Sequence, residues 1–442
     1  METASVAPYT PPVRVSQVSV ENYRSFVDRA KLELRPLTLL FGYNSAGKSA
    51  AIRLLPILAA SASRAAAATL ALDAEAARGA SFRDILSRQS AGTTLAVGLR
   101  FAELQDTLKV EYVIRDLPER QVQIVERLQI ESSAPADVPI EALWDTQLAD
   151  SGSRMQTYDF RSGELAVGRL PMRIDGLSFE PPADQPFTPL MQRAAVCVRE
   201  LAENVYWLNS LRAIPPRTAR FGVRPKRLSS DGSNAPDFLA HDSLASGDLV
   251  KETSRWFERA TGHRLTVSPF AVAGERHYAL ALAALGSLSA LEIPIVDTGE
   301  GMAQVLPVIV LGSLARLGRL GRNALLAIEH PELHLHPAAH AELAAFFCSL
   351  TSVPAAPIAL IETHSENFLL RVQLGIARGE LSPATVVVHW IRGLEDGRSV
   401  VDTITFDDAA RPQGAGWPPG VFAEDTEQAK ALLRARRERG LA

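Results

Sequence analysis

A glycine-rich stretch near the N-terminus has the residue types and the spacing that bind a phosphate group. Residues 42–49 read GYNSAGKS; an apolar run at 37–41 precedes them and a helix-forming run at 50–55 follows. Gly42 and Gly47 allow the backbone to curl, so that successive N–H groups can converge on phosphate oxygens. We therefore expect an anion-binding turn between a buried strand and a helix.

Two side chains at the end of this stretch supply the charge and the metal contact that a nucleotide needs. The Lys48 ammonium can reach the β- and γ-phosphates, and the Ser49 hydroxyl can take one coordination position of Mg²⁺. The helix that begins near Lys48 directs the positive end of its dipole at the same anion. The sequence thus predicts a nucleotide with Mg²⁺, bound by Asn44, Ser45, Ala46, Gly47, Lys48 and Ser49.

Two later strands end in polar residues that could complete this chemistry. The apolar run 324–328 leads to Glu329, and a phosphate-loop enzyme needs a second acid that orients Mg²⁺ at the end of a strand. The strand at 357–361 is followed by Glu362-Thr363-His364-Ser365. Ligands of such sheets bind at the carboxyl ends of the strands, so we expect Glu329 at the metal and His364 at the ligand crevice.

A second glycine-rich loop, DTGEGMAQ at 297–304, opens another helix. Its free N–H groups and the helix dipole would suit a further phosphate. One chain cannot easily place both loops on the same γ-phosphate, whereas two chains arranged head to tail can. We therefore expect Gly299, Glu300 and Gly301 of one subunit to contact the nucleotide of another.

The order of the expected elements indicates an α/β fold with a mostly parallel sheet, helices on both faces and an antiparallel meander. Residues 1–131 carry the phosphate loop and the meander. Residues 132–285 read as an inserted helical and α+β lobe, loop-rich from 132 to 190. Residues 286–442 return to alternating strands and helices, with a final helix from about Glu424.

Composition limits the compartment and the partners. The 442 residues have a net charge of −4, so no overall field draws the chain to nucleic acid or to an anionic membrane. Cys197 and Cys348 resemble reduced core residues, and the first residues lack the features of a secretion signal. The alanine-rich stretch 54–72 is too polar to span a bilayer. We expect a cytoplasmic protein that does not enter a membrane.

Two further side-chain groups have competing interpretations. The segment 212–227 carries six cations and no acid, which suits nucleic-acid phosphates or a solvated loop: Arg212, Arg217, Arg220, Arg224, Lys226 and Arg227. The histidines at 334, 336 and 340 have a spacing that zinc could use. No fourth ligand is visible in the sequence, which favours structural roles for these histidines.

Four motifs in order resemble the RecF/OLD branch of the ABC-type and SMC-like ATPases. GYNSAGKS resembles the Walker A motif, DTGEGMAQ the signature loop, LLAIEHPELHLHP the Walker B motif with its D-loop, and ETHSENF the His switch. The segments LRAIPPR and GWPPGVF resemble one subgroup of predicted prokaryotic AAA-type ATPases, whereas residues from about 100 to 285 match only loosely.

The resemblance implies ATP held between two subunits, with the signature loop of one facing the phosphate loop of the other. It makes Gln89 the candidate for a Q-loop metal ligand. The chain departs from the family pattern after the Walker B strand, because Glu329 is followed by His330 where a second acid is usual. Either His330 or Glu332 could then activate the attacking water, and slow hydrolysis or ATP used as a clamp would be consistent with this departure.

The function predicted from these features is an ATP-binding and ATP-hydrolysing homodimer, or higher homo-oligomer. It would control a separate effector protein or clamp nucleic acid, in prokaryotic antiphage defence. A RecF-like DNA-repair ATPase and a nucleotide-binding scaffold with little catalysis are the alternatives. The ATPase subunit of a transporter is disfavoured, because such a subunit would carry Asp-Glu at 329–330.

Overall fold

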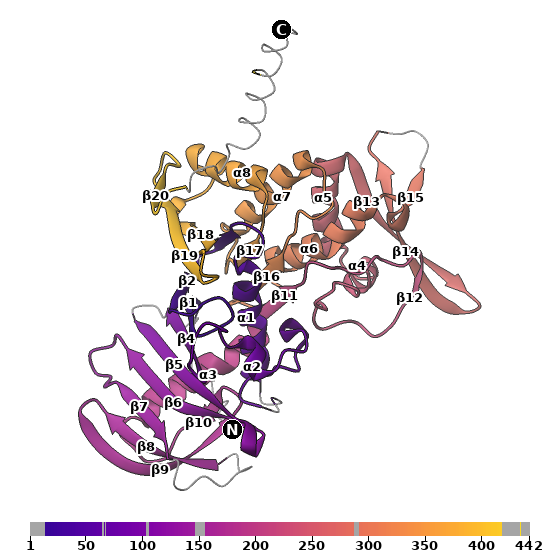
Figure 1. Cartoon of the computed structure of the whole chain (residues 1–442). Coiled ribbons are helices and arrows are strands. Elements are labelled where there is room, and N and C mark those ends of the chain that lie inside the picture. Colours follow the sequence, from indigo (N-terminus) through magenta and orange to yellow (C-terminus); the bar gives the residue numbers. More distant parts are fainter. Residues whose placement is uncertain are drawn as a thin grey trace, which may run out of the picture.

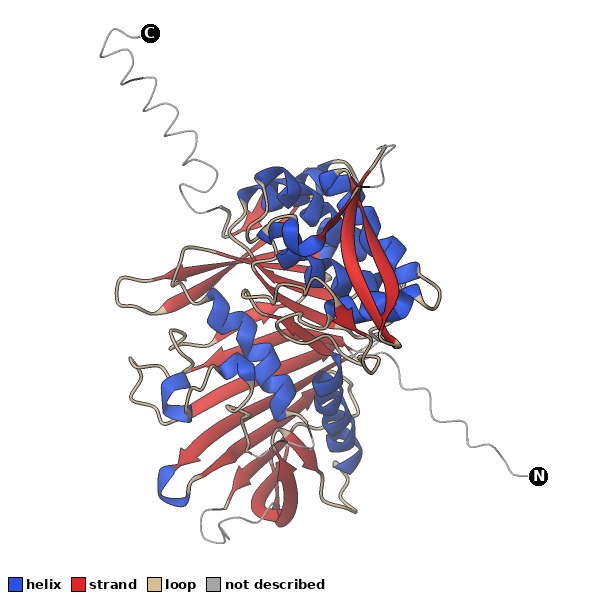
Figure 2. Ribbon diagram, turned by 90° about the vertical axis from the view of Figure 1, so that its right-hand side faces the viewer, coloured by secondary structure: helices blue, strands red, loops and turns tan. Residues whose placement is uncertain are grey.

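The computed structural model describes residues 14–63, 66, 68–102, 106–145, 155–286, 291–417 and 434. These residues form two large β-sheets and a smaller one, with helices packed around them (Figure 1). The views in Figures 1 and 2 place an antiparallel sheet at one end of the molecule and most helices at the other. The predicted fold class, a mostly parallel sheet with helices on both faces together with an antiparallel meander, is confirmed.

A seven-stranded sheet forms the centre of the molecule. Its order is β11 (Val205–Leu208), β16 (Leu325–Glu329), β17 (Ile358–Glu362), β3 (Leu37–Phe41), β18 (Val386–Gly393), β19 (Ser399–Phe406) and β20 (Pro412–Gly414). The first five strands run parallel; β19 is antiparallel to β18, and β20 is antiparallel to β19. Every residue of β3, β16 and β17 is buried, as expected for parallel strands covered on both faces.

Helices cover both faces of this sheet. One face packs on α1 (Lys48–Ser61) and α3 (Thr188–Asn204), and the other on α6 (Glu300–Arg316), α7 (Pro337–Leu350) and α8 (Glu366–Ala377). Side chains alternate along each strand. Leu325 and Ala327 therefore belong to the core beside α1, while Leu326 and Ile328 belong to the core on the other side. The same alternation directs the last residues of β16 and β17 towards α1.

A nine-stranded antiparallel sheet packs against α1 and α3 from the other side. Its order is β10 (Ser178–Glu180), β9 (Leu165–Asp175), β8 (Met155–Ser162), β7 (Ile140–Trp144), β6 (Val122–Ser132), β5 (Thr107–Leu117), β4 (Thr94–Ala102), β1 (Arg14–Glu21) and β2 (Ala30–Glu33). The expectation of a loop-rich stretch from 132 to 190 was wrong, because β7–β10 continue this sheet. The predicted boundary at 131/132 lies inside β6.

The third sheet forms a lateral lobe, on the right of Figure 1. It contains β12 (Ala219–Arg220), β14 (Glu275–Ala284), β13 (His263–Val272) and β15 (Glu292–Pro294), and it packs with α4 (Ala235–Ser243) and α5 (Asp248–Thr261). The predicted lobe at 132–285 was too wide, because β11 lies in the central sheet beside β16.

Short helical turns complete the described chain: α2 (Phe82–Ile85) and 3₁₀ turns at Glu75–Ala77, Pro118–Arg120, Ile295–Asp297 and Pro383–Thr385. The expected final helix falls outside the described residues apart from Arg434, as does the GWPPGVF segment beyond Trp417. No helix in the described part of the chain is both long enough and apolar enough to cross a membrane.

Candidate functional site

The glycine-rich loop connects β3 to α1, as the sequence predicts. Gly42 and Gly47 have φ angles of 147° and 103°, a region that side chains rarely adopt. Space is also lacking at both positions. A Cβ atom on Gly42 would lie 2.2 Å from the Ile391 carbonyl oxygen, and one on Gly47 would lie 2.8 Å from the Ser25 hydroxyl. Conformation therefore favours glycine at both positions, and the backbone contact at Gly42 leaves no room for any side chain.

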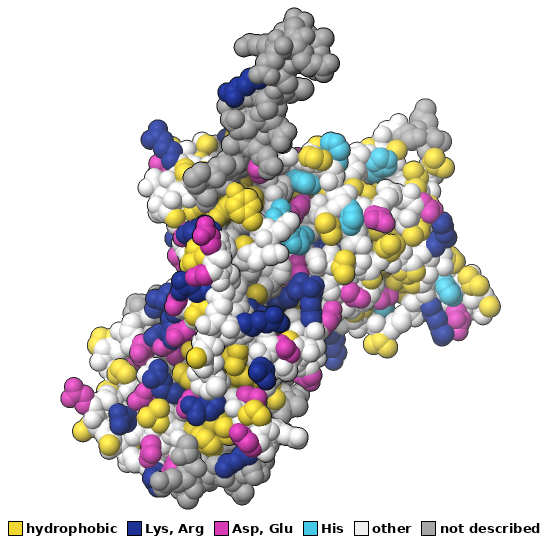
Figure 3. Space-filling model, in the orientation of Figure 1, with side chains coloured by type: hydrophobic (Ala, Val, Ile, Leu, Met, Phe, Trp, Pro, Cys, Tyr) yellow, Lys and Arg dark blue, Asp and Glu magenta, His cyan; other side chains and the backbone are white. Residues whose placement is uncertain are grey.

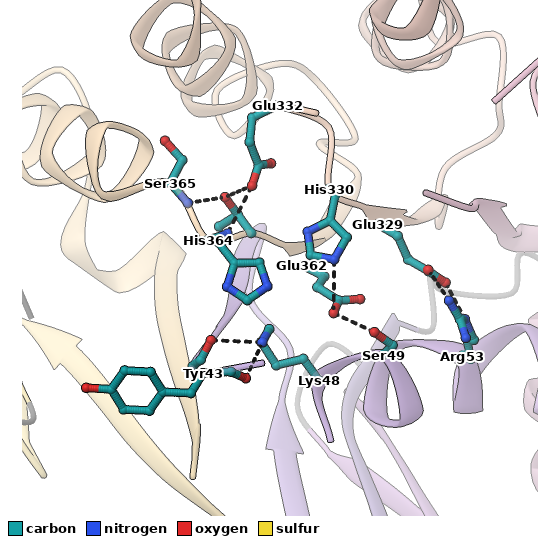
Figure 4. Close-up of polar contacts among 12 residues, drawn as sticks. Tyr43, Lys48, Ser49, Arg53, Glu329, His330, Glu332, Glu362, His364 and Ser365 are labelled. Carbon is teal, nitrogen blue, oxygen red and sulfur yellow. Dashed lines mark hydrogen bonds and ion pairs between the residues drawn. The ribbon is translucent and has the colours of Figure 1, made fainter. Parts of the chain in front are cut away.

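Lys48 is the first residue of α1, and its ammonium turns back onto the loop (Figure 4). Its Nζ donates hydrogen bonds to the carbonyl oxygens of Gly42, at 2.8 Å, and Tyr43, at 2.7 Å. Burial lowers the pKa of Lys48, and the nearby Glu362 carboxylate opposes this shift. Asn44 and Ser45 are exposed in the middle of the loop.

The loop is also supported from behind. Ser399 Oγ lies 2.7 Å from the Ala46 carbonyl oxygen and 2.7 Å from Ser25 Oγ. These two serines come from β19 and from the turn after β1, so both ends of the chain contact the loop.

The carboxylate that faces Ser49 is Glu362, at the end of β17. Ser49 Oγ donates a hydrogen bond to Glu362 Oε1 at 2.7 Å, and His330 Nε2 lies 3.5 Å from the same oxygen (Figure 4). The other oxygen, Oε2, is buried and has no hydrogen-bond partner among the described residues. Burial raises the pKa of Glu362, while His330 and Ser49 oppose the shift. Glu362 was expected directly after a strand, but no role was predicted for it.

Glu329, the predicted metal ligand, has other partners. Its carboxylate forms an ion pair with the guanidinium of Arg53 from α1, with Nε at 2.6 Å from Oε1. The indole Nε1 of Trp207 on β11 donates to the same oxygen at 3.0 Å. No hydrogen bond between Glu329 and Ser49 occurs in the described structure. The metal role of Glu329 stays a prediction, and its visible contacts are those of an anchored ion pair.

A third buried charge lies beneath the residues that follow β16. Arg212 Nη2 donates hydrogen bonds to the carbonyl oxygens of Glu329 and, at 3.2 Å, His330. Burial lowers the pKa of Arg212 to about 10, although the carboxylates of Glu332 and Glu329 favour its charge. This arginine therefore supports the site from inside the protein.

The two histidines predicted at the site stack on each other. The rings of His330 and His364 have centroids 5.0 Å apart and planes 12° apart. His330 has a φ of 43°, and its backbone N–H donates to the Glu362 carbonyl oxygen at 2.9 Å. The pKa of His364 falls to about 4, chiefly through burial and then through the positive charge of Lys48. His364 is therefore neutral at pH 7.

Glu332 holds the segment that carries His364. Its Oε1 accepts hydrogen bonds from Thr363 Oγ1, at 2.8 Å, and from the His364 backbone N–H, at 2.9 Å. The side chain is buried. These contacts give Glu332 a positioning role, while its other oxygen, Oε2, is buried and has no hydrogen-bond partner among the described residues.

The signature loop lies next to the D-loop of its own chain. Gly299 precedes α6 with a φ of 94° and is exposed, and the Glu300 carboxylate lies 3.7 Å from His334 Nδ1. Gly301 is buried, and a Cβ atom there would lie 2.4 Å from the His334 carbonyl oxygen. Across the described ranges, no hydrogen bond joins residues 297–304 to the phosphate loop.

Gln89 does not reach the phosphate loop by any hydrogen bond in the described structure. Its Nε2 donates to the Asp396 carbonyl oxygen in the turn between β18 and β19. Its role as a Q-loop metal ligand stays a prediction.

The remaining histidines have structural contacts. His336 Nδ1 accepts a hydrogen bond from the Ala338 N–H at the start of α7. His340 Nδ1 lies 2.8 Å from Ser365 Oγ.

Most cations of the basic segment 212–227 have partners within the protein, although the segment itself contains no acid. Arg212 is buried, Arg217 forms a two-fold ion pair with Asp297, and Arg220 pairs with Glu275 at 3.0 Å. Arg227 donates to the Glu203 carbonyl oxygen and lies over the Tyr206 ring. The opposing acids come from distant parts of the chain, so local sequence could not reveal them.

The residues around Ser49 fit a hard cation. The unpartnered Glu362 Oε2 and the Ser49 hydroxyl are oxygen ligands of the kind that Mg²⁺ prefers. Among the described residues, no three His, Cys, Asp or Glu side chains are grouped closely enough to hold a metal by themselves. Mg²⁺ usually binds through one or two protein oxygens together with phosphates and water, which agrees with this sparse set.

Comparison with known proteins gives one family match. Residues 205–371 match the family described as "AAA domain, putative AbiEii toxin, Type IV TA system". No protein of curated function matches the chain.

The solved structures that are similar to the chain include three heads of Smc proteins. One, bound to the C-terminal winged-helix domain of ScpA, has a TM-score of 0.49 and 10% identity over 90% of this chain and 99% of that one. The Thermotoga maritima SMC head has a TM-score of 0.41 and 9% identity over 88% and 98%. A Pyrococcus furiosus head has 0.48 and 10% over 96% and 100%. The TM-scores are below 0.5, so we base no conclusion on this likeness. The family match over β11–α8, together with the phosphate-loop geometry, supports an ATPase of the P-loop class.

Proposed function

We propose that the chain binds ATP with Mg²⁺ and hydrolyses it at the loop 42–49. The observation that supports this most directly is the convergence of the Lys48 ammonium and the Ser49 hydroxyl at the start of α1, beside buried carboxylates. The N–H groups of residues 44–49 and the α1 dipole would hold the phosphates. Mg²⁺, when bound with the nucleotide, would neutralise charge that develops on the transferred phosphoryl group.

The residues of this chain would then position and deprotonate the attacking water. The Glu332 side chain is buried and its Oε1 holds Thr363 and His364 in place, whereas the His330 side chain is 22% exposed at the edge of the site. We therefore assign the general base to His330, which lies against His364 and beside Glu362. A histidine in the place of the usual acid is consistent with slow turnover.

Replacement of Lys48 tests the proposal. Lys48→Ala should lower the rate of ATP hydrolysis by about 10²–10³-fold, because a fixed cation no longer meets the developing phosphate charge. Phosphate release and binding of a fluorescent ATP analogue are the measurements. Lys251→Ala, on the exposed face of α5, is the matched control and should keep the wild-type rate. Undiminished hydrolysis by Lys48→Ala would refute the assignment.

We further propose that two chains act as a head-to-tail dimer that controls a separate effector protein in antiphage defence. Gly299 is exposed before α6. In the described structure, the signature loop has no hydrogen bond to the phosphate loop of its own chain. Both observations support contact of the signature loop with the nucleotide of a second chain. The description of the matched family mentions a toxin and a toxin–antitoxin system, which is in line with a defence role. Cys197 and Cys348 form no disulfide, which suits the reducing cytoplasm.

The contacts of the basic segment 212–227 argue against a nucleic-acid surface. Four of the six cations at 212–227 already have partners within the protein. On the face shown in Figure 3, Lys and Arg side chains are interspersed with Asp and Glu over the nine-stranded sheet. A surface of mixed sign gives little counterion release on a phosphate backbone.

A further inference from the structure

We propose that Glu362 on β17, and not Glu329 on β16, supplies the carboxylate that holds the metal ion of the bound nucleotide. This inference rests on the proposed binding of ATP and Mg²⁺. It assigns the metal contact to a residue that follows a different strand from the Walker B acid suggested by the motif. Glu329 becomes a positioning residue.

The strand order places Glu362 nearer to the loop. β17 lies between β16 and β3, and β3 is the strand that leads into the phosphate loop. Glu362 is in register with Leu40 of β3, and the Thr363 N–H donates to the Leu40 carbonyl oxygen at 3.1 Å. Glu329 is in register with Glu362 and is therefore one strand farther from the loop. Neighbouring strands are about 4.8 Å apart, so the two carboxylates are not equivalent.

Helix α1 presents a different partner to each carboxylate. Ser49 and Arg53 are four residues apart and thus lie on one face of the helix, one turn apart. Ser49 bonds to Glu362, and Arg53 pairs with Glu329 (Figure 4). Since Ser49 is the residue that would contact the metal, the carboxylate next to it is the one in reach of the same ion.

The hydrogen-bond partners of the two carboxylates support the same assignment. Glu362 Oε2 is buried and has no hydrogen-bond partner among the described residues, which is costly for an anionic oxygen unless a cation compensates it. Both oxygens of Glu329 are used, by Arg53 and by Trp207. A metal bound to Glu329 would have to displace the guanidinium and leave Arg53, 12% exposed in its side chain, without its counter-charge.

The contacts of Glu329 define its positioning role. Through Arg53 and Trp207 it joins β16 to α1 and to β11. This junction would fasten α1 to the central sheet. Glu329 would thus stabilise the helix without contacting the metal.

Mn²⁺ binding, followed by electron paramagnetic resonance of free Mn²⁺, tests the assignment without turnover. The titration uses the full chain with a non-hydrolysable ATP analogue, and compares Glu362→Gln with Glu329→Gln. We expect Glu362→Gln to weaken Mn²⁺ binding in the ternary complex at least about 10-fold, since a charged ligand is lost. Glu329→Gln should keep Mn²⁺ affinity within about 3-fold while its melting temperature falls, because the buried Arg53 loses its ion pair.

A second variant covers the case in which Glu329→Gln does not fold. Arg53→Met with Glu329→Met removes the ion pair as a unit and should retain Mn²⁺ affinity near the wild-type value. Loss of Mn²⁺ binding in the folded double variant, with Glu362→Gln unaffected, would overturn the inference and return the metal to Glu329.

The outcome also separates this inference from the proposed function. If the wild-type chain binds neither the analogue nor Mn²⁺ with the analogue, the ATPase proposal fails. If the wild type binds both and Glu362→Gln binds Mn²⁺ equally well, only the assignment of Glu362 fails.

Discussion

At the scale of single residues, the contact between Arg53 and Glu329 decides how α1 sits on the central sheet. The Glu329 side chain is 1% exposed and that of Arg53 is 12% exposed. Removing both charges from water is expensive, and their attraction offsets this cost only while both partners are present. The pair therefore contributes little net stability as a unit but penalises the loss of either member strongly.

Arg53→Met should destabilise the fold by about 3–5 kcal/mol, because it leaves the Glu329 carboxylate buried without a counter-charge. Urea denaturation gives this free energy. Adding Glu329→Met should recover most of the loss. Arg220→Met is the control, since its pair with Glu275 is exposed and such pairs contribute about 0–1 kcal/mol. A loss below about 1 kcal/mol for Arg53→Met would contradict this view of the pair.

The sequence identified the loop residues but could not choose between the two acids. The spacing of glycines with Lys48 and Ser49 predicts a turn between a strand and a helix, which β3 and α1 form. Which carboxylate reaches Ser49 depends on the order of β16, β17 and β3 in the sheet. That order is set by packing of distant segments, and local periodicity carries no information about it. An acid at the end of each of two buried strands was the available signal.

At the scale of elements, the start of α6 is pressed against the D-loop. Gly301 is the second residue of the helix, and its Cα approaches the His334 carbonyl so closely that a Cβ atom would lie 2.4 Å from that oxygen. The contact is with backbone, which cannot rotate away as a long side chain can. A glycine at this position therefore sets the distance between the signature loop and the segment that follows β16.

Gly301→Ala should destabilise the protein by about 1–3 kcal/mol through overpacking, although alanine is the better helix former. Thermal unfolding followed by circular dichroism measures the loss. Gly222→Ala is the matched control, since a Cβ atom there meets nothing within 4 Å. A stability of Gly301→Ala equal to or above that of the wild type would show that α6 can shift without cost.

The strands β7–β10 could not be predicted from sequence patterns. β9 has the sequence LAVGRLPMRID, and its first five residues are exposed. Those five residues have no buried face and therefore no reason to alternate apolar and polar side chains; only farther along do Leu170, Met172 and Ile174 face the core. The stretch also contains a proline and a glycine, which usually indicate loops. Hydrogen bonding to β8 determines its conformation instead.

At the scale of the whole molecule, the proposed dimer divides each nucleotide site between two chains. The signature loop is exposed at Gly299, and Thr298 just before it is half-buried, with its hydroxyl bonded to the Ile295 carbonyl oxygen. Thr298 has an ordinary backbone conformation, so it can be substituted more safely than Gly301. A carboxylate there would stabilise the N-terminus of α6 but repel a phosphate of the partner chain.

The Thr298→Asp variant should therefore bind ATP normally and hydrolyse it poorly. The Thr298→Asn variant, whose side chain has the same shape without the charge, should retain more activity.

Mixing the Thr298→Asp and Lys48→Ala variants should restore part of the wild-type rate, because one of the two shared sites in a mixed dimer contains neither defect. Phosphate release by the mixture is the measurement. Full activity of Thr298→Asp alone would eliminate the shared-site arrangement.

The contacts of Ser399 behind the phosphate loop also constrain when the nucleotide site can form during synthesis of the chain. Ser399 contacts Ala46 and Ser25 across 353 and 374 residues of sequence. The two neighbours of β3 in the sheet, β17 and β18, likewise begin only at Ile358 and Val386. A ribosome therefore releases the glycine-rich loop early, yet the strand that carries it has no partner until most of the polypeptide has emerged. We expect the nascent chain to depend on chaperones during this interval and to gain affinity for nucleotide only near the end of translation.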